Sequence, residues 1–469
     1  METNLGIISV VPPLVAILLA FITRNAIFSL AFACLLGVLL TGSGPQGFTK
    51  LMINALANSS FTWVFLLEIF IGILIAFFLK TGAIKGFTVF VARQKLSRAG
   101  IQLSAWAMGI FVFFSDYFSP LFVGTTMRSI ADKARISREK MAYIADSTSA
   151  PVSVIVPITG WAIYITGITI GMGPIVDSTV AIGFFIKSIP YNFYAIIAIF
   201  LVGLISSGVI SDFGSMFKAE NRARDDGKVL GDNATPMIGR ELLETSLFTN
   251  FQPNIILYFI IPVFLIIGIA AGSFFLAGSA QTMEAFLAAV VFLGVMIRIQ
   301  GIPLSEIMDT AMLGIKSIMP AVMILALAYT INQLTTELGT ANYILSISSS
   351  FLNPSMLPAC AFLFAAVISF STGTSWGTFA IMLPIAVPMA FNYSGDAITP
   401  LVCSTLAAVA GGGVFGDHCS PLSDTSILAS TGAASDHMDH IKTQIPYAIL
   451  SAGVSLVIYF VLGWLLFTS

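Results

Sequence analysis

Two short runs of the chain combine aspartate with small hydroxyl residues and a proline. The first run spans residues 146–153 (DSTSAPVS) and the second spans residues 417–425 (DHCSPLSDT). A proline inside a helix removes a backbone donor and breaks the helix, which leaves carbonyl oxygens free. Carboxylates, hydroxyls and free carbonyls are the hard oxygen ligands that a small cation such as sodium needs. The two runs therefore predict a binding site for an ion or a polar substrate. Its candidate residues are Asp146, Ser147, Thr148, Ser149, Asp417, Ser420, Ser423, Asp424 and Thr425.

Two other segments, residues 101–127 and 355–390, are apolar at both ends and polar in the middle. The middle of the first reads FSDYFSP and the middle of the second reads STGTSWG. A polar loop at a surface has a similar composition, but both of these turns are enclosed by Phe, Trp and Ile. We interpret the segments as re-entrant hairpins, because irregular backbone at membrane depth must be buried in protein or line a watery cavity. Further candidate binding residues at the hairpin tips are Asp116, Ser119, Ser371, Thr372, Thr374 and Trp376.

Acidic side chains at membrane depth are costly and by default functional. The four aspartates that we expect to contribute to sodium binding are Asp116, Asp146, Asp417 and Asp424. A purely structural role, capping the amides of a broken helix, is the alternative for Asp417 and Asp424, and Asp146 has a similar alternative.

Glu68 lies in the apolar run FLLEIF and should face the interior of the helix bundle. A low-dielectric site favours the neutral form of a lone carboxyl group, as a proton carrier requires. A glutamate hydrogen-bonded to a neighbouring hydroxyl group explains the same position equally well.

Other chemistry is disfavoured by spacing. Asp417, His418 and Cys419 are consecutive, so their side chains point in different directions and are poorly placed to share a transition metal. His437 and His440 follow in a short polar loop, where we expect solvated side chains. A Ser/His/Asp hydrolase is disfavoured, because the only histidines besides His418 are these two loop residues. We therefore predict that the chain is not an enzyme and needs no cofactor other than sodium as a coupling ion.

The composition indicates the environment in which these residues work. Of the 469 residues, 57% are hydrophobic and only 9% are charged, and the mean hydropathy is +0.95. Soluble domains contain about 25% charged residues, so a water-soluble enzyme is excluded. The 21 basic and 23 acidic residues give a net charge of -2, which argues against nucleic acid as a partner. The four cysteines show no paired spacing and should be free thiols.

Apolar stretches long enough to cross a bilayer recur along the whole chain. We expect an all-α polytopic membrane protein with about ten transmembrane helices, of which two are broken. The predicted spans are 7–23, 25–41, 62–80, 138–172, 192–210, 253–272, 283–298, 315–332, 398–430 and 444–467.

Charge predicts the orientation of these spans, because loops on the cytoplasmic side collect Lys and Arg. Basic residues flank the hairpin 101–127 on both sides, whereas residues 317–441 contain no Lys or Arg. The ends of the first hairpin should therefore face the cytoplasm and those of the second should face outward. This topology places every basic residue except Lys50 and Lys187 on the cytoplasmic side.

The order of spans and hairpins predicts two inverted repeats of five spans, each with a re-entrant hairpin and a broken helix. In both broken spans an aspartate precedes a short polar run and then Ser, Pro and Ser. The predicted domains are the first repeat at 1–210, a cytoplasmic connector at 211–252 and the second repeat at 253–469.

Two stretches resemble the NhaC-type sodium/proton antiporter family, which is part of the ion transporter superfamily. They are GGGVFGDHCSPLSDTSILAS at 411–430 and ISREKMAYIADSTSAPVSVIVPITGW at 136–161. The resemblance implies a sodium-linked secondary transporter of the bacterial inner membrane. The family's Gly-Asp-x-x-Ser-Pro-x-Ser-Asp-Thr motif and its first-half Asp-Ser-Thr match binding candidates named above. The hairpin resembles the family's Asp-Tyr-Phe-Asn pattern, with Ser119 in place of the asparagine.

The resemblance favours sodium/proton antiport by alternating access, and the family also includes members that resemble sodium-driven importers of amino acids. A symporter for an amino acid or a similar small organic solute is therefore the alternative, since the hydroxyl-rich second tip with Trp376 suits a larger pocket. The expected partners are sodium, protons or a small organic solute, and the lipid bilayer. A homodimer is one option for the assembly. A channel is less well supported, because paired broken helices are typical of alternating access.

Overall fold

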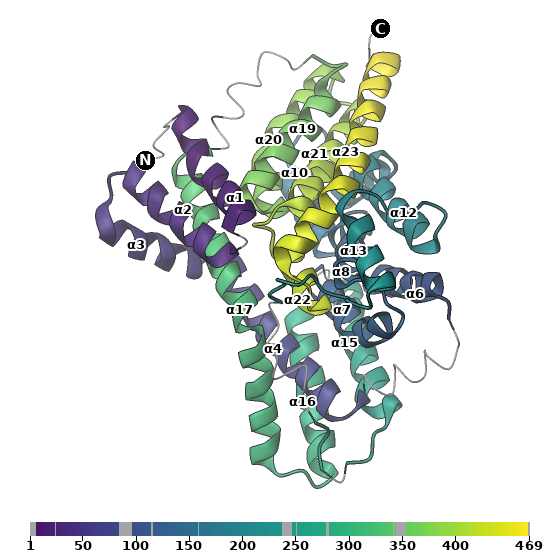
Figure 1. Cartoon of the computed structure of the whole chain (residues 1–469). Helices are drawn as coiled ribbons and strands as arrows, with labels where there is room; N and C mark the ends of the chain where they lie inside the picture. Colours follow the sequence, from purple (N-terminus) through teal and green to yellow (C-terminus); the bar gives the residue numbers. More distant parts are fainter. Residues whose placement is uncertain are drawn as a thin grey trace.

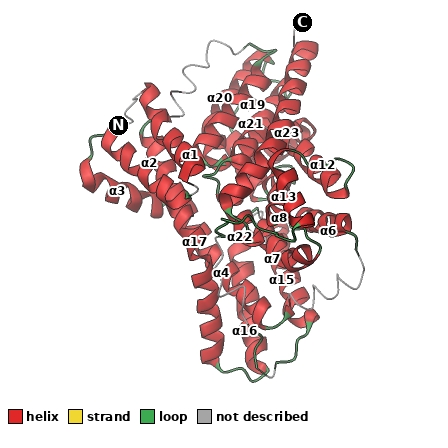
Figure 2. Cartoon of the chain, in the orientation of Figure 1, coloured by secondary structure: helices red, strands yellow, loops and turns green. Residues whose placement is uncertain are grey.

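The computed structural model of the chain describes residues 6–23, 25–83, 96–113, 116–157, 159–236, 246–249, 251–277, 281–340, 343 and 353–467. These residues form helices joined by turns and loops, with no strand among them (Figure 2). The predicted all-helical fold is therefore confirmed. The helices of the first half are α1 (Val11–Thr23), α2 (Ala26–Leu40), α3 (Gly44–Leu56), α4 (Ser59–Lys80), α6 (Arg98–Phe111), α7 (Phe118–Lys133), α8 (Arg138–Ser147), α9 (Ala150–Ser153), α10 (Gly160–Thr169), α11 (Ser178–Ser188) and α12 (Phe193–Ser207).

The second half follows a short helix of the predicted connector, α13 (Gly214–Asp225). Its helices are α15 (Ile261–Ala277), α16 (Thr282–Ile299), α17 (Leu304–Glu337), α19 (Leu357–Thr372), α20 (Ser375–Tyr393), α21 (Pro400–Cys419), α22 (Asp424–Ala433) and α23 (His437–Phe467).

Six helices in the described part of the chain are long and apolar enough to cross a membrane, or up to eight if each of two bent pairs counts as one span. The bends measure 51° between α11 and α12 and 45° within α17. Shorter apolar helices include Gly6–Leu19, Ile27–Leu40 and Leu357–Thr372. The chain is thus consistent with a multi-pass membrane protein, while the count of ten spans and the inverted repeat stay predictions.

Both predicted breaks are present. α8 ends at Ser147, and only the four-residue helix α9 separates this end from the next turn. α21 ends at Cys419, and α22 starts at Asp424 after an extended Ser420. Each break therefore lies where the sequence combines hydroxyl residues with proline.

Each of the two predicted hairpins consists of two consecutive helices in the structure, α6 and α7 in the first and α19 and α20 in the second. Residues 114 and 115 of the first tip lie outside the described residues. The second tip turns at Gly373, whose φ of +71° is unfavourable for other residues. A side chain there would also overlap the backbone of Leu422, so the tip packs directly on the break between α21 and α22.

The apolar interior is divided into two main hydrophobic cores. The first core contains buried residues of α1, α2, α4, α6–α8, α15–α17 and α22, and the second contains those of α9–α11 and α19–α21. The helices α12 and α23 contribute to both cores. Figure 1 shows α15, α16 and α4 at one end of the molecule and α19–α21 toward the other, with α7, α8 and α22 between them. The two parts of each broken helix belong to different cores, so the breaks lie where the cores meet.

Small residues permit the closest helix contacts at this junction. A Cβ atom at Gly416 of α21 would overlap the backbone of Ala366 and Phe370, and one at Gly432 of α22 would overlap the backbone of Pro120. α21 is thereby held against α19, and α22 against α7. The hairpins and the breaks form one packed unit.

The four cysteines are free and buried, as expected from their spacing.

The predicted orientation can be tested at two exposed positions, Asp226 after α13 and Ala397 between α20 and α21. Single cysteines introduced at these positions, in a variant without the four native cysteines, should react with an impermeant maleimide from opposite sides of the membrane. Labelling of both positions from the same side would contradict the orientation inferred from charge.

Candidate functional site

Asp417 in the last turn of α21 joins the broken helix to the tip of the second hairpin. Its Oδ2 accepts hydrogen bonds from the Ser375 hydroxyl at 2.6 Å and from the Ser375 backbone N–H at 3.3 Å. The side chain is 1% exposed, and its Oδ1 has no hydrogen-bond partner among the described residues. One oxygen of this carboxylate is therefore fixed in place and the other remains available to a ligand.

The hydroxyl groups around this contact serve mainly the backbone. Ser420 donates to the Phe370 carbonyl oxygen at 2.8 Å, which ties the break to the end of α19. Ser371 and Thr372 donate to the Ile368 carbonyl oxygen at 2.9 and 2.8 Å. Thr374 caps α20 through the N–H of Gly377 at 3.5 Å. These predicted ligands stabilise the tip, and their oxygens can also contact a cation as acceptors.

Asp424 starts α22 and connects the same break to the first hairpin. Its Oδ2 accepts a hydrogen bond from the Tyr117 hydroxyl at 3.0 Å, and its Oδ1 accepts one from the Thr425 N–H at 2.8 Å. Ser423 caps the helix by accepting from the Ser426 N–H at 3.3 Å, and its hydroxyl lies 3.1 Å from that of Thr425. Both hairpin tips thus meet at the break between α21 and α22.

Asp116 adds a third buried carboxyl group from the first tip. It is 5% exposed, lies beside Trp161, and its Oδ2 is without a partner in the described part of the chain. Its charge interacts with those of Asp417 and Asp424. Like charges buried together are unfavourable unless a cation or protons neutralise them. The cluster is therefore an electrostatic site for positive charge.

No group of three His, Cys, Asp or Glu side chains within the described residues is arranged to hold a metal ion. A cation bound near Asp417 would therefore need hydroxyl and carbonyl oxygens in addition to carboxylates. Sodium accepts such mixed oxygen ligands, and the broken helices present them.

Asp146 is the centre of a separate buried network. Its Oδ2 accepts hydrogen bonds from the Gln444 amide at 2.7 Å, the Ser426 hydroxyl at 2.8 Å and His440 Nε2 at 3.2 Å. Its Oδ1 has no partner among the residues that the structure describes. These contacts link α8 to both α22 and α23, so Asp146 positions three helices around the junction.

The polar residues that follow Asp146 have local partners. Ser147 Oγ lies 3.0 Å from His418 Nε2, whose other ring nitrogen lies 2.8 Å from the Tyr194 hydroxyl. Thr148 and Ser149 donate to carbonyl oxygens of α8, at 2.8 Å to Ile144 and 2.7 Å to Asp146. The hydroxyls of Thr148 and Ser149 thus serve the end of the broken helix, and Ser147 connects this group to His418, the residue after Asp417.

The prediction that His437 and His440 lie in a solvated loop is wrong. Both residues lie in the first turn of α23 and are buried, with 4% and 0% exposure. His437 contacts the Pro421 carbonyl oxygen at 3.0 Å and the Ser430 hydroxyl at 3.1 Å. The two histidines are three residues apart on a helix, so both rings lie on one face. Asp436 directly precedes α23 and accepts from the Asp439 N–H, and an aspartate at this position is a signal for a helix start that the sequence offered.

Glu68 faces the interior of the first core, as predicted, and is fully buried in α4. Neither carboxyl oxygen has a hydrogen-bond partner among the described residues. A hydrogen bond to a neighbouring hydroxyl, the alternative considered from the sequence, is therefore not seen. An unpartnered buried carboxyl group favours its neutral form.

Aromatic rings close one side of the site. The Trp161 and Trp376 rings lie 5.4 Å apart, the Tyr164 ring lies 4.7 Å from that of Trp376, and the Tyr164 hydroxyl donates to the Trp376 carbonyl oxygen at 3.2 Å. Both indole Nε1 atoms are buried and have no acceptor within the described residues.

Ser119, a predicted ligand in the first hairpin, is also buried, and its hydroxyl lies 3.4 Å from the Gly109 carbonyl oxygen.

Several residues of the site were not among the candidates predicted from the sequence. They are Tyr117, Trp161, Ser375, His418, Ser426, His440 and Gln444. Tyr117 and Ser375 stand inside the two hairpin tips, so the sequence carried a local signal for them. The contacts of Ser426, His440 and Gln444 with Asp146 span more than 270 residues and had no such signal.

A family model described as the Na+/H+ antiporter family matches residues 160–464. The chain belongs to this family. The resemblance to NhaC-type antiporters is thereby confirmed, as is the prediction that the chain is not an enzyme. The matched region contains the second hairpin, the break between α21 and α22, and Trp161.

Individual relatives are consistent with this assignment. An uncharacterized protein of Haemophilus influenzae is 33% identical over 97% of this chain and 91% of its own length. The Na(+)/H(+) antiporter NhaC of Alkalihalophilus pseudofirmus is 29% identical, over 34% of this chain and 32% of its length. The arginine/ornithine antiporter ArcD of Halobacterium salinarum is 31% identical, over 37% and 35%. The chain is thus similar to antiporters with both inorganic and organic cargo in their names.

The carboxylate cluster can be tested by removing charge while keeping shape. We expect Asp417→Asn and Asp424→Asn to reduce transport at least tenfold, or about 1.4 kcal/mol, because each change weakens the attraction for positive charge. Transport should be measured in proteoliposomes at matched protein content. Asp225→Asn is the control, since that side chain is 62% exposed. Wild-type rates in both test variants would leave only the capping role.

Proposed function

We propose that the protein exchanges sodium for protons by alternating access in a bacterial inner membrane. The observation that carries this proposal is the meeting of both hairpin tips at the break between α21 and α22, where Asp116, Asp417 and Asp424 are buried together. Membership of the Na+/H+ antiporter family supports sodium and protons as the transported species.

The electrostatics of the cluster support competition between the two ions. Unpaired oxygens of Asp116 and Asp417 are available to a cation, within the part of the chain that the structure describes. A bound sodium ion would neutralise the charge that protons otherwise neutralise, so one ion displaces the other. Such competition is sufficient for exchange if the site opens alternately to the two sides.

We assign the sodium ligands to the carboxylates of Asp116, Asp417 and Asp424, together with oxygens of the break and the second tip. Asp146 is the fourth carboxylate proposed from the sequence. Because its Oδ2 already accepts three hydrogen bonds, only its Oδ1 would be available to an ion.

Glu68 is the proposed separate proton carrier. Its burial in α4 without a hydrogen-bond partner among the described residues supports a carboxyl group that spends part of the cycle protonated. Since α4 belongs to the first core, a proton on Glu68 would travel with that core.

The two cores provide a basis for alternating access. Secondary transporters rock one bundle against another around a fixed site. Here the breaks and hairpin tips lie at the junction of the cores, and the inverted repeat predicted from the sequence would relate the two open states. The sodium site would then be reached from either side without a continuous pore.

Flux measurements test the exchange directly. With purified protein in proteoliposomes and no organic solute, an inward sodium gradient should drive protons outward, seen as a pH-dye signal. Potassium and choline gradients of equal strength should give none. Sodium at about 100 times its Kd should also stabilise the protein by about 2.7 kcal/mol, because it binds only the folded state. Proton movement that is indifferent to sodium would disprove the exchange.

A sodium-driven symporter for an amino acid or similar solute is the second candidate. The specific observation in its favour is the buried indole N–H of Trp376, which lacks an acceptor in the described part of the chain and lies beside Trp161, whose indole N–H faces the Asp116 carboxyl group. Neither a sodium ion nor a proton can accept a hydrogen bond, whereas a carboxylate of an organic solute can. The name of the related arginine/ornithine antiporter adds support for organic cargo.

Trp161→Phe and Trp376→Ala distinguish the two candidates. If a solute carboxylate accepts from the indoles, both changes should weaken solute uptake about tenfold, since a lost hydrogen bond to a charged group costs about 1.5–3 kcal/mol. Sodium-dependent stabilisation should change much less. Uptake of radiolabelled amino acids by these variants is the measurement, and sodium-driven uptake without a proton signal would replace exchange by symport.

A further inference from the structure

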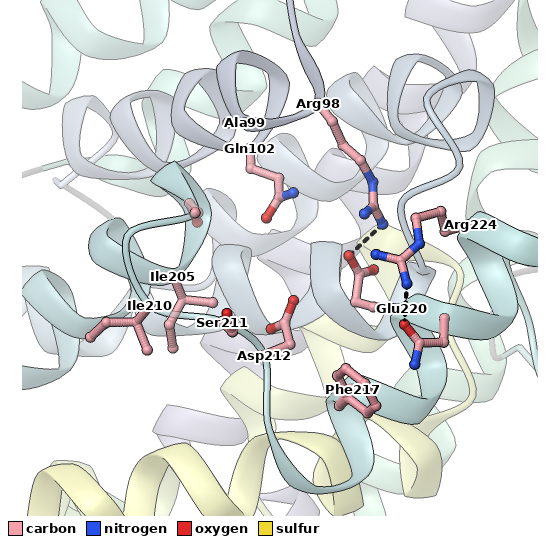
Figure 3. Close-up of a pocket in the computed structure, with 13 residues that line it drawn as sticks. Arg98, Ala99, Gln102, Ile205, Ile210, Ser211, Asp212, Phe217, Glu220 and Arg224 are labelled. Atoms are coloured by element: carbon pink, nitrogen blue, oxygen red, sulfur yellow. Dashed lines mark hydrogen bonds and ion pairs between the residues drawn. The ribbon is translucent and has the colours of Figure 1, made fainter.

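A cavity of about 290 Å3 lies away from the proposed ion site, between the start of α6, the end of α12 and α13. Figure 3 shows polar side chains from these three segments pointing toward a common space. None of its lining residues belongs to a hairpin tip or to a helix break. Its lining includes Arg98, Gln102, Ser206, Asp212, Glu220 and Arg224.

Three polar atoms of this lining lack hydrogen-bond partners among the residues that the structure describes. They are Gln102 Oε1, Ser206 Oγ and Arg98 Nε. Gln102 is 6% exposed and Ser206 is 1% exposed. Buried polar atoms nearly always have partners, so these three atoms must find theirs among the molecules that fill the cavity.

The acidic groups of the lining already have partners within the protein. Glu220 accepts from Arg98 at 2.5 Å and from the Ser137 N–H at 2.8 Å. Asp212 is ion-paired with the buried Lys140 and accepts from the Tyr447 hydroxyl at 2.8 Å. The cavity therefore offers the groups that remain, namely donors on Arg98 and Ser206 and an acceptor on Gln102.

These groups define the chemistry of an occupant. The Arg98 Nε–H and the Ser206 hydroxyl are donors that suit a carboxylate, whereas the Arg224 guanidinium group is bonded to Asp225 and Asn221. The Gln102 carbonyl oxygen needs a donor on the same molecule, such as an amino or hydroxyl group. Ile210 and Phe217 complete the wall with apolar surface. The volume is at the lower end of the range for small-molecule sites, about 300–1,000 Å3.

We propose that this cavity binds a small organic acid that carries an amino or hydroxyl group next to its carboxylate. The site differs from the transport site in its residues and does not depend on the ion exchanged. Because Glu220 and Asp212 hold Ser137 and Lys140 in the first turn of α8, the bound acid acts on the broken helix that carries Asp146.

Binding can be measured by titration calorimetry on the purified full-length protein in detergent. L-Serine and L-lactate are the probes, with acetate, ethanolamine and inorganic phosphate for comparison. At least one of the two probes should bind at least tenfold more tightly than all three comparison compounds. Failure of both probes to bind, or equal binding of acetate or phosphate, would overturn the proposal.

Variants place the bound acid in the molecule. Gln102→Leu and Ser206→Ala should each weaken binding of the probe at least tenfold. Ser207→Ala is the matched control, because the neighbouring Ser207 donates to the Leu204 carbonyl oxygen at 2.8 Å and does not line the cavity. Thermal unfolding at the wild-type temperature in all three variants verifies their folding. Loss of probe binding in Trp376→Ala but not in Gln102→Leu would place the acid in the transport site and disprove this one.

Discussion

The arrangement of this protein depends on the cost of burying several carboxylates together. Asp116, Asp417 and Asp424 lie in the protein interior, where water cannot screen their mutual repulsion. Each is held by a different element, and Ser375 and Tyr117 from the two hairpin tips bind two of them. The hydrogen bonds orient the carboxylates without removing their charge. The same packing that builds the junction thus favours neutralisation of these carboxylates, by protons or by a cation.

The sequence was most informative where chemistry and helix geometry coincide. Proline beside Asp417 and Asp146 predicted where the helices break, and the polar tips predicted the hairpins. Glu68 was correctly placed inside the bundle, because a single acid in an apolar helix has few other options. These features are local, so a few neighbouring residues determine them.

The contacts that the sequence did not predict are long-range. Asp146 meets His440 and Gln444 only because α23 returns to α8 after the whole second half of the chain. His437 and His440 were predicted to lie in a polar loop. Asp436 carries a local signal for the start of α23, but no neighbouring residue indicates that the fold buries the two rings. The number of spans was also difficult to predict, because short apolar helices and bent pairs do not match a bilayer thickness one by one.

The division into two cores has a mechanical consequence. Force applied between the cores would reach the backbone first at the breaks after Ser147 and Cys419, where the regular ladder of helical hydrogen bonds is interrupted. The helices α12 and α23, in contrast, continue from one core into the other, because each contributes buried residues to both. Under tension these two helices would therefore carry load between the cores, while the broken helices would yield at their breaks. The compliance of the molecule is concentrated in a few residues beside its acidic centre.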